Sequence, residues 1–150
     1  MRARGFSLLE MLLVMAIIAF AGLLAASAMT GGFDGIRLRS ATSDIAAQLR
    51  FTRAQAMATG KRQDFSIDPH AHTWRAPKER HGTLPKQLGI AFYGAREVQP
   101  SANEGGIAFF PDGASTGGRI RLTVKNAARD IDVAWLTGEV RVKRGDAGSP

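Results

Sequence analysis

The feature that most constrains this chain is a long uncharged stretch near its N-terminus. No Asp, Glu, Lys or Arg occurs from Met11 to Thr30, and most of the residues there are aliphatic or small. As a helix, this stretch would be about 30 Å long, which matches the hydrocarbon core of a bilayer. Arg2 and Arg4 precede it, in the charge order of a targeting or anchoring segment. The sequence therefore predicts one membrane-spanning helix.

A cleaved signal peptide is the alternative interpretation of the same stretch. Ala26-Ser27-Ala28 has the small-x-small pattern of a signal peptidase site. The apolar region of an ordinary signal peptide is shorter than the one found here, however. The length of the stretch therefore favours an anchor that is retained.

Glu10 is an acidic residue with apolar neighbours on both sides. A carboxylate near the hydrocarbon costs roughly 2 to 3 kcal/mol and is usually paired. If the chain were cut after Gly5, the α-ammonium of Phe6 in a neighbouring subunit could meet Glu10 inside a packed helix bundle. The alternative is that Glu10 lies at the membrane interface and extends its carboxylate into water.

The segment Gly5-Phe6-Ser7-Leu8-Leu9-Glu10, followed by the apolar run, resembles the class III signal of type IV pilins and type II secretion pseudopilins. This resemblance implies that a prepilin peptidase cleaves after Gly5 and N-methylates Phe6. It also implies that Glu10 enters the filament and neutralises the N-terminus of an adjacent subunit. Residues 1–5 would then be a leader peptide, and residues 6–30 the transmembrane and filament-core helix.

Glycines in the segment 30–35 predict a break after the apolar helix. Apolar residues then recur at three- and four-residue steps from Leu38 to Ala56, and Gly60 fits a helix stop. We expect residues 31–60 to be the soluble half of the helix, with a flexible glycine-rich joint, packed on a sheet. The basic residues of this half could contact lipid headgroups or partner subunits, or lie on a solvated face: Arg37, Arg39, Arg50 and Arg53.

Residues 61–144 show the pattern of short strands separated by turns, and residues 145–150 are expected to fray. Trp135 is expected on the same strand face as Ile131 and Val133. The fold class predicted is α+β, a long N-terminal membrane-spanning helix followed by an antiparallel β-sandwich or curled sheet. Residues 77–89 are expected to form a loop. The expected strands are residues 63–68, 73–75, 90–93, 107–110, 119–124, 130–135 and 139–142.

The soluble part resembles the GspH/FimT group of minor pseudopilins and pilins over residues 107–120 and 135–140, and least over residues 70–105. This resemblance implies a minor, H-type pseudopilin of the type II secretion system. Such a subunit joins a short periplasmic pseudopilus that drives export of folded proteins across the outer membrane. Its implied partners are the other major and minor pseudopilins, prepilin peptidase and inner-membrane lipid. Its implied location is the bacterial inner membrane, single-pass, with the C-terminal domain in the periplasm.

Catalytic and metal sites are not predicted. The chain has no cysteine, which excludes a disulfide framework, a cysteine nucleophile and a thiolate zinc site. The glycine-rich segment 112–119 lacks the Gly-Lys-Ser/Thr ending of a P-loop and leads into a strand, so we interpret it as a hairpin connection. His70, His72 and His81 lie in a polar loop without a defined fourth ligand. We expect no cofactor, no metal and no enzymatic activity.

Two further polar features have ordinary structural explanations. Ser115 has no His-carboxylate pattern nearby that would suggest a triad. Asp130 and Asp132 share one face of an edge-like strand, where solvation explains them.

A formal net charge of +7 leaves a second function open, that of a FimT-like minor type IV pilin in pilus assembly or in DNA binding and uptake. Aromatic residues do not alternate with the cations that would bind DNA, and acidic neighbours such as Glu139 indicate a mixed surface. The cations that could form a patch contacting phosphates are Arg119, Arg121, Arg141, Lys143 and Arg144.

Overall fold

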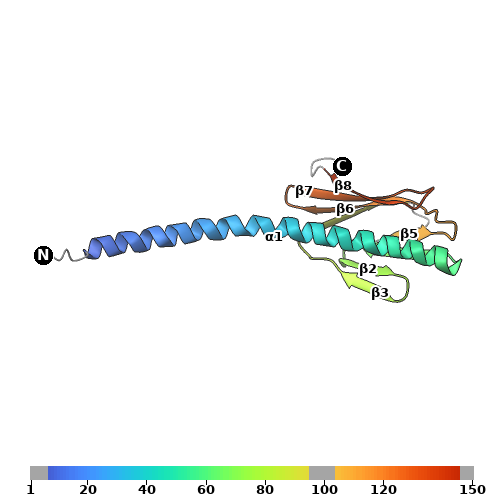
Figure 1. Ribbon diagram of the computed structural model, residues 1–150, viewed down its shortest axis with the longest axis horizontal. Coiled ribbons are helices and arrows are strands. Elements are labelled where there is room, and N and C mark those ends of the chain that lie inside the picture. The colour runs from blue at the N-terminus through green and yellow to red at the C-terminus, as the bar shows by residue number, and fades with distance from the viewer. Residues whose placement is uncertain (1–6, 95–103, 146–150) are drawn as a thin grey trace. The chain divides into compact units, whose positions relative to one another are not determined.

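The computed structural model describes residues 7–94 and 104–145, and for residues 26–32 it describes the backbone only. The chain divides into two compact units, Met1–Asp34 and Gly35–Pro150. One helix, α1 (Leu8–Thr59), supplies the described part of the first unit and the first element of the second (Figure 1).

Helix α1 has clear sequence signals at both ends. The Ser7 hydroxyl accepts a hydrogen bond from the backbone N–H of Leu9 at 3.2 Å, as an N-cap residue does. At the other end Gly60 has a φ of 63°, the left-handed conformation of a helix stop, which confirms the predicted end.

The predicted break after the apolar stretch is wrong. The backbone stays helical through Gly31, Gly32 and Gly35. A glycine costs a helix only about 1 kcal/mol relative to alanine, and its backbone groups still make the intrahelical hydrogen bonds. The boundary between the two units nevertheless falls in this segment, between Asp34 and Gly35. Its flexibility stays a prediction.

The first unit has no core of its own among its described residues. Leu8–Ala25 has a mean hydropathy of 2.5, and none of this segment is buried. Its length and composition suffice for one membrane span. Large apolar side chains such as Leu8 and Phe20 are exposed along it. This surface requires an apolar environment, which a bilayer or a bundle of similar helices would provide.

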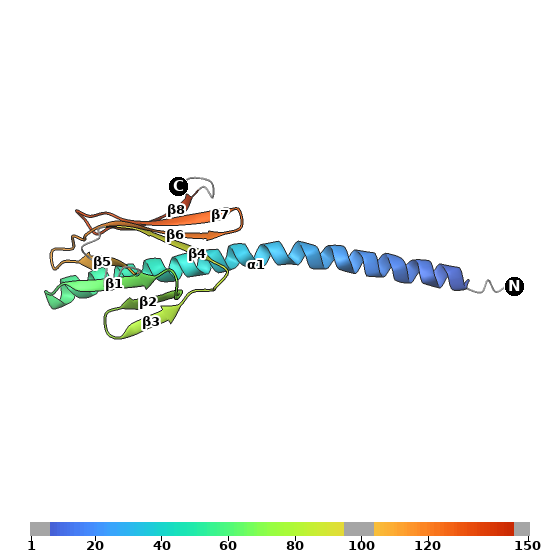
Figure 2. The ribbon, with the colours of Figure 1, turned by 180° about the vertical axis from the view of Figure 1, so that it is seen from behind.

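The second unit contains two antiparallel four-stranded sheets. The first has the order β3-β2-β1-β5 and the second the order β4-β6-β7-β8. In Figures 1 and 2 the second sheet lies on one side of α1, and β2 and β3 lie on the other. The strands are β1 (Gln63–Asp68), β2 (Thr73–Ala76), β3 (Arg80–Thr83), β4 (Gly89–Tyr93), β5 (Gly105–Phe109), β6 (Gly118–Val124), β7 (Ala127–Val133) and β8 (Val140–Gly145).

A single core joins the helix to both sheets. Ile45 and Leu49 of α1 are buried against inward-facing residues of the strands, among them Phe65 of β1, Ile107 of β5 and Ile131 of β7. The three- and four-residue spacing on α1 and the period of two on the strands predicted these positions correctly. The predicted class, an apolar N-terminal helix followed by a domain of antiparallel sheets, is confirmed.

Strand β3 corrects the loop predicted over residues 77–89. Lys78 and Glu79 adopt positive φ angles of 60° and 57°, which turn the chain back so that Arg80–Thr83 pairs with Thr73–Ala76. The residues of β3 are mostly exposed and polar, so this strand carries no apolar alternation. Strand β3 pairs with β2 through backbone hydrogen bonds, and the pattern of apolar and polar side chains does not predict these.

The connection from β5 to β6 is not the predicted hairpin, because the two strands belong to different sheets. A tight turn does form locally, with a single bridge between Phe109 and Ser115 and a hydrogen bond from the Gly113 N–H to the Phe110 carbonyl. The chain then crosses to the second sheet. The turn residues in the sequence indicated a reversal, but they do not specify the sheet that the next strand joins.

Strand β7 also differs from its prediction. It ends at Val133, so Trp135 lies in the connection to β8 and is 69% exposed. At the C-terminus, Gly145 is paired with Ala128 in the ladder between β7 and β8. Of the tail predicted to fray, residues 146–150 lie outside the described residues.

Candidate functional site

The predicted processing site lies at the N-terminus. Gly5 and Phe6 are outside the described residues, so cleavage after Gly5 and methylation of Phe6 stay predictions. Glu10 lies in the first turn of α1 and is exposed. An acidic side chain in the first turn interacts favourably with the helix dipole. No Lys or Arg in the described part of the chain forms an ion pair with Glu10.

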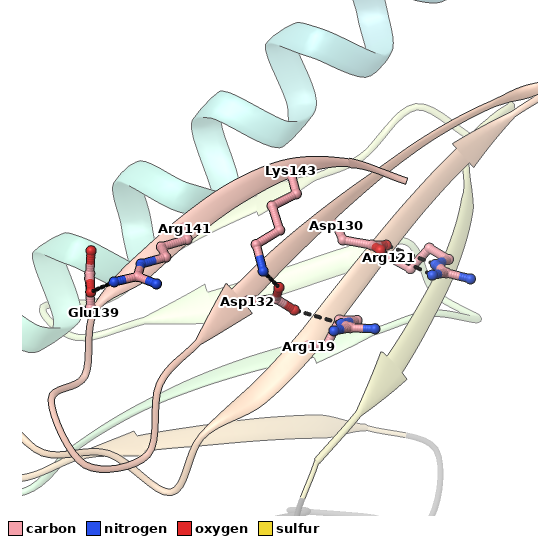
Figure 3. A network of polar contacts seen from close by, with 7 residues as sticks. All are labelled: Arg119, Arg121, Asp130, Asp132, Glu139, Arg141 and Lys143. Carbon is pink, nitrogen blue, oxygen red and sulfur yellow. Dashed lines mark hydrogen bonds and ion pairs between the residues drawn. The ribbon is translucent and has the colours of Figure 1, made fainter. Parts of the chain in front are cut away.

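Four of the five predicted basic residues come together on the outer face of the second sheet, and Arg144 does not. Arg119 is directly opposite Asp132 across the β6–β7 ladder, and Arg121 is opposite Asp130. Lys143 on β8 is opposite Asp130 from the other side. Residues directly opposite in an antiparallel ladder lie on the same face. The cations therefore surround two carboxylates instead of forming a free basic patch (Figure 3).

Ion pairs join most of these side chains. Asp132 accepts from the Arg119 Nε at 2.5 Å and lies 3.1 Å from the Lys143 Nζ. Asp130 accepts two hydrogen bonds from Arg121, at 2.7 and 3.0 Å. The side chains of this second pair are only 10% and 11% exposed, so the pair is largely removed from water. Because each of these cations is already paired with a carboxylate, it is less available to bind another anion.

The pKa values follow from these contacts. Burial by itself raises the pKa of Asp132, but the hydrogen bonds from Arg119 and Lys143 outweigh it and bring the pKa below its ordinary 3.8. The hydrogen bonds to Asp132 and Asp130 raise the pKa of Arg119 and of Arg121, respectively. Asp132, Arg119 and Arg121 are therefore ionised at neutral pH.

A third pair lies at the end of β8. Arg141 donates to the Glu139 carboxylate at 2.6 Å, which lowers the pKa of Glu139 and raises the pKa of Arg141. Both side chains are more than half exposed, so this pair contributes little to stability. The seven side chains in Figure 3 are four cations and three carboxylates, which leaves an excess of one positive charge on this face.

The structure corrects the interpretation of Asp130 and Asp132 as solvated residues of an edge strand. Strand β7 is interior, between β6 and β8, and both carboxylates are ion-paired. A signal for this pairing was present in the sequence. Arg-x-Arg at 119–121 and Asp-x-Asp at 130–132 are equidistant from the turn at residues 125–126, which places them in register.

Arg144 is the one predicted basic residue that lies elsewhere. It is opposite Arg129 in the β7–β8 ladder and therefore lies on the other face from Lys143. The five residues predicted as one basic patch are thus divided between the two faces of the sheet.

An open hollow of about 640 Å³ lies on the outer face, lined by Tyr93 and the ion-paired residues. Beside it is the β7–β8 connection, where Trp135 and Leu136 are 69% and 66% exposed. The sequence pattern does not reveal this exposed pair, because the apolar alternation of Ile131 and Val133 continues through Trp135 in the sequence.

Backbone contacts fix the connection that carries Trp135 and Leu136. The Ser115 N–H donates to the Trp135 carbonyl at 2.8 Å, and the Gly138 N–H donates to the Ala134 carbonyl at 2.8 Å. Gly138 has a φ of 62°, and a Cβ atom there would lie 2.2 Å from the Gly113 carbonyl oxygen. Two exposed apolar side chains held by an ordered backbone have the properties of an anchor for a protein partner.

A metal site receives no support from the histidines. Within residues 7–94 and 104–145, no three His, Cys, Asp or Glu side chains are grouped so as to hold a metal ion. The Nδ1 of His81 contacts the Glu79 carbonyl at 2.8 Å, within its own turn.

Comparison with known proteins agrees with this architecture. Residues 41–138 match the family model for type II transport protein GspH, and residues 1–26 match the model for the prokaryotic N-terminal methylation motif. Type II secretion system protein H of Xanthomonas campestris pv. campestris is 62% identical over 138 residues, which are 92% of this chain and 82% of that protein.

Solved structures share the fold at low sequence identity. The minor pseudopilin EpsH from the type II secretion system of Vibrio cholerae has a TM-score of 0.53 at 14% identity, over 76% of this chain and 97% of that chain. The type IV minor pilin FimU of Pseudomonas aeruginosa has a TM-score of 0.54 at 12% identity, over 71% and 87%. The family-model match and the Xanthomonas relative together show that this chain belongs to the GspH family of type II transport proteins.

Proposed function

We propose that this chain is a structural subunit of a short periplasmic pseudopilus, which drives export of folded proteins across the outer membrane. The observation that carries the proposal is one continuous helix with two different surfaces. Its Leu8–Ala25 segment is apolar and exposed, and its second half is part of the core of a GspH-type domain. Such a subunit can be stored in a membrane and then stacked with similar helices, its apolar surface covered in both states.

The proposal includes location and processing. Leu8–Ala25 would span the inner membrane once, with the domain from Gly35 onward in the periplasm. Prepilin peptidase would cleave after Gly5 and methylate Phe6, as the match to the methylation motif over residues 1–26 suggests. Glu10 would then pair with the α-ammonium of an adjacent subunit, which reduces the cost of a carboxylate among apolar helices.

Contact with a sister pseudopilin would use the exposed pair Trp135 and Leu136. Large aromatic side chains presented by an ordered backbone are the usual anchors of protein interfaces, and the neighbouring ion-paired face would form a polar rim. We propose no catalytic step for this surface, since the matched family is described as one of type II transport proteins.

The alternative, a FimT-like minor pilin that binds DNA, has less support. Binding to DNA phosphates needs cations that are free to replace counterions. Arg119, Arg121 and Lys143 are instead paired with Asp130 and Asp132 on the face that was predicted to bind.

Complementation of a gene deletion tests the proposal and the alternative together. Wild-type protein should restore export of the folded substrates and leave pilus-dependent motility and DNA uptake unchanged. Glu10→Val should be cleaved normally but should fail to restore export, because the subunits lose a charge contact during stacking. Glu10→Gln is the matched control for size. Normal export with Glu10→Val would contradict the role of Glu10, and restored DNA uptake instead of export would favour the pilin alternative.

A further inference from the structure

Two arginines face each other at the end of the second sheet. Arg129 of β7 and Arg144 of β8 are directly opposite in the antiparallel ladder. Like charges in this position repel one another and destabilise a sheet. Neither side chain forms an ion pair within the described part of the chain, whereas the opposite face of the same strands pairs Asp130 and Asp132 with cations.

Arg129 connects two hollows that carry further arginines. The first has a volume of about 390 Å³ and is lined by Arg129, Arg144 and Gly35, among others. The second has a volume of about 220 Å³, and Arg39 and Arg50 of α1 contribute to its wall together with Arg129. None of the described residues that line these two hollows is acidic. Three elements thus place four arginines around adjoining hollows, and no described carboxylate lines either of them.

Hydrogen bonds in the described part of the chain leave most N–H donors of these four arginines unused. Arg50 donates to the Val140 carbonyl at 3.1 Å, which fixes one of the four side chains. A guanidinium has five N–H donors in a planar fork, a geometry that matches the oxygen atoms of a phosphate. An anion with several oxygen atoms would satisfy these donors and relieve the repulsion between Arg129 and Arg144.

The chain itself limits where this cluster can lie. Gly35, which lines the first hollow, is ten residues beyond Ala25, where the apolar membrane-spanning segment ends. Ten residues span at most about 36 Å even when fully extended. The anionic surface available within that reach of a membrane anchor is a layer of lipid headgroups, and clustered arginines next to a membrane span are attracted to anionic lipid.

We propose that Arg39, Arg50, Arg129 and Arg144 form a binding site for the phosphate of an anionic phospholipid headgroup. This inference rests on the membrane anchoring that is part of the proposed function. The site would hold the domain against the lipid surface while the subunit waits in the membrane. Stacking into a filament would then require release of the headgroup.

Native mass spectrometry of the full chain, released from detergent micelles, tests this site. The micelles contain equal amounts of phosphatidylglycerol and phosphatidylcholine with the same acyl chains, so both lipids can adhere to the apolar helix. The wild-type protein should retain phosphatidylglycerol over phosphatidylcholine by about fivefold or more. Equal retention of the two lipids would overturn the proposal.

Variants identify the residues that produce the preference. Arg129→Gln with Arg144→Gln should bring the retention ratio close to one. Arg62→Gln with Arg141→Gln is the matched control, because it removes two exposed arginines that are paired with Asp64 and Glu139 outside the cluster. The control should keep the preference. An equal loss in both double variants would show that only total charge matters and would contradict the site.

Arg144→Glu separates lipid binding from folding. The new carboxylate would be opposite Arg129, so thermal stability should stay the same or increase while the preference for phosphatidylglycerol is lost. A retained preference in this variant would contradict the proposal.

Two competing ligands complete the test. Inorganic phosphate at millimolar concentration should leave the preference unchanged, since it has no acyl chains to hold it at the site. Its appearance as an adduct in place of phosphatidylglycerol would show a site for free phosphate and overturn the lipid assignment. Binding of a short DNA duplex through Arg129 and Arg144, without a lipid preference, would overturn it in favour of nucleic acid.

Export in the complementation assay reports separately on the proposed function, because lipid preference can be lost while export persists.

Discussion

At the scale of single residues, two aspartates on the outer face of the second sheet form ion pairs that differ in burial and therefore in their effect on stability. Asp130 and Asp132 are two residues apart on one strand and both accept from arginine. Asp130 is buried with Arg121, whereas the partners of Asp132 are about half exposed. Desolvation makes the loss of one partner costly in the first pair, and water screens the second.

Replacement of these two aspartates should therefore have unequal effects. Asp130→Asn should lower the free energy of unfolding by about 2 kcal/mol, because it leaves a charged partner without its counter-ion in a dry position. Asp132→Asn, the matched control, should lower it by about 1 kcal/mol or less. Urea unfolding of the full chain in detergent micelles, followed by circular dichroism, measures both values. Equal losses would show that burial does not distinguish the two pairs.

Acid should weaken the Asp132 cluster in a defined pH range. The pKa of Asp132 in the folded chain is below its ordinary 3.8, so the ionised carboxylate favours the folded state above about pH 4. This contribution is lost as the pH falls through the folded pKa. The melting temperature of the wild-type protein should fall more steeply below pH 4 than that of Asp132→Asn. Parallel curves for the two proteins would contradict the ion pairing of Asp132.

At the scale of elements, side-chain periodicity predicted what becomes buried but not which strands become neighbours. The positions of Ile45, Leu49 and Ile131 in the core follow from their spacing. Strand β3 was missed because an exposed edge strand needs no apolar alternation. The crossing from β5 to β6 was missed because turn residues specify a reversal and not the sheet that follows.

Two glycines with the same backbone conformation allow a controlled test of the β7–β8 connection. Gly138 and Gly60 have φ angles of 62° and 63°, but only at Gly138 would an added Cβ atom meet other atoms. Gly60→Ala should cost about 1 kcal/mol, for the backbone conformation alone. Gly138→Ala should cost about 2 to 3 kcal/mol, because the Gly113 carbonyl must also move.

Urea unfolding measures the free energy of unfolding of both glycine variants, and tryptophan fluorescence reports on the exposed Trp135. Loosening of the connection in Gly138→Ala should change the fluorescence of Trp135, whereas Gly60→Ala should leave it unchanged. Similar unfolding free energies for the two variants would contradict the close approach of Gly138 to Gly113.

At the scale of the whole molecule, the sequence predicted the apolar N-terminal helix and the β-rich domain, because hydropathy and periodicity act over many residues. It did not predict that the helix continues through Gly31, Gly32 and Gly35, since glycine lowers helix stability without preventing helix formation. The basic patch could be predicted only in part. Strand neighbours decide whether an arginine is paired, as Arg119 is, or opposite another arginine, as Arg144 is.

The mature N-terminus of the protein purified from bacterial membranes tests the central claim most directly. N-terminal sequencing and intact mass should give a chain that begins at Phe6 and carries one N-methyl group. Gly5→Ala should leave the precursor uncut, which would show that cleavage depends on Gly5. A natural protein that begins at Met1 would contradict the account, because Phe6 would then have no α-ammonium to pair with Glu10. A protein that begins after Ala28 would also contradict it, because the apolar anchor and Glu10 would both be missing.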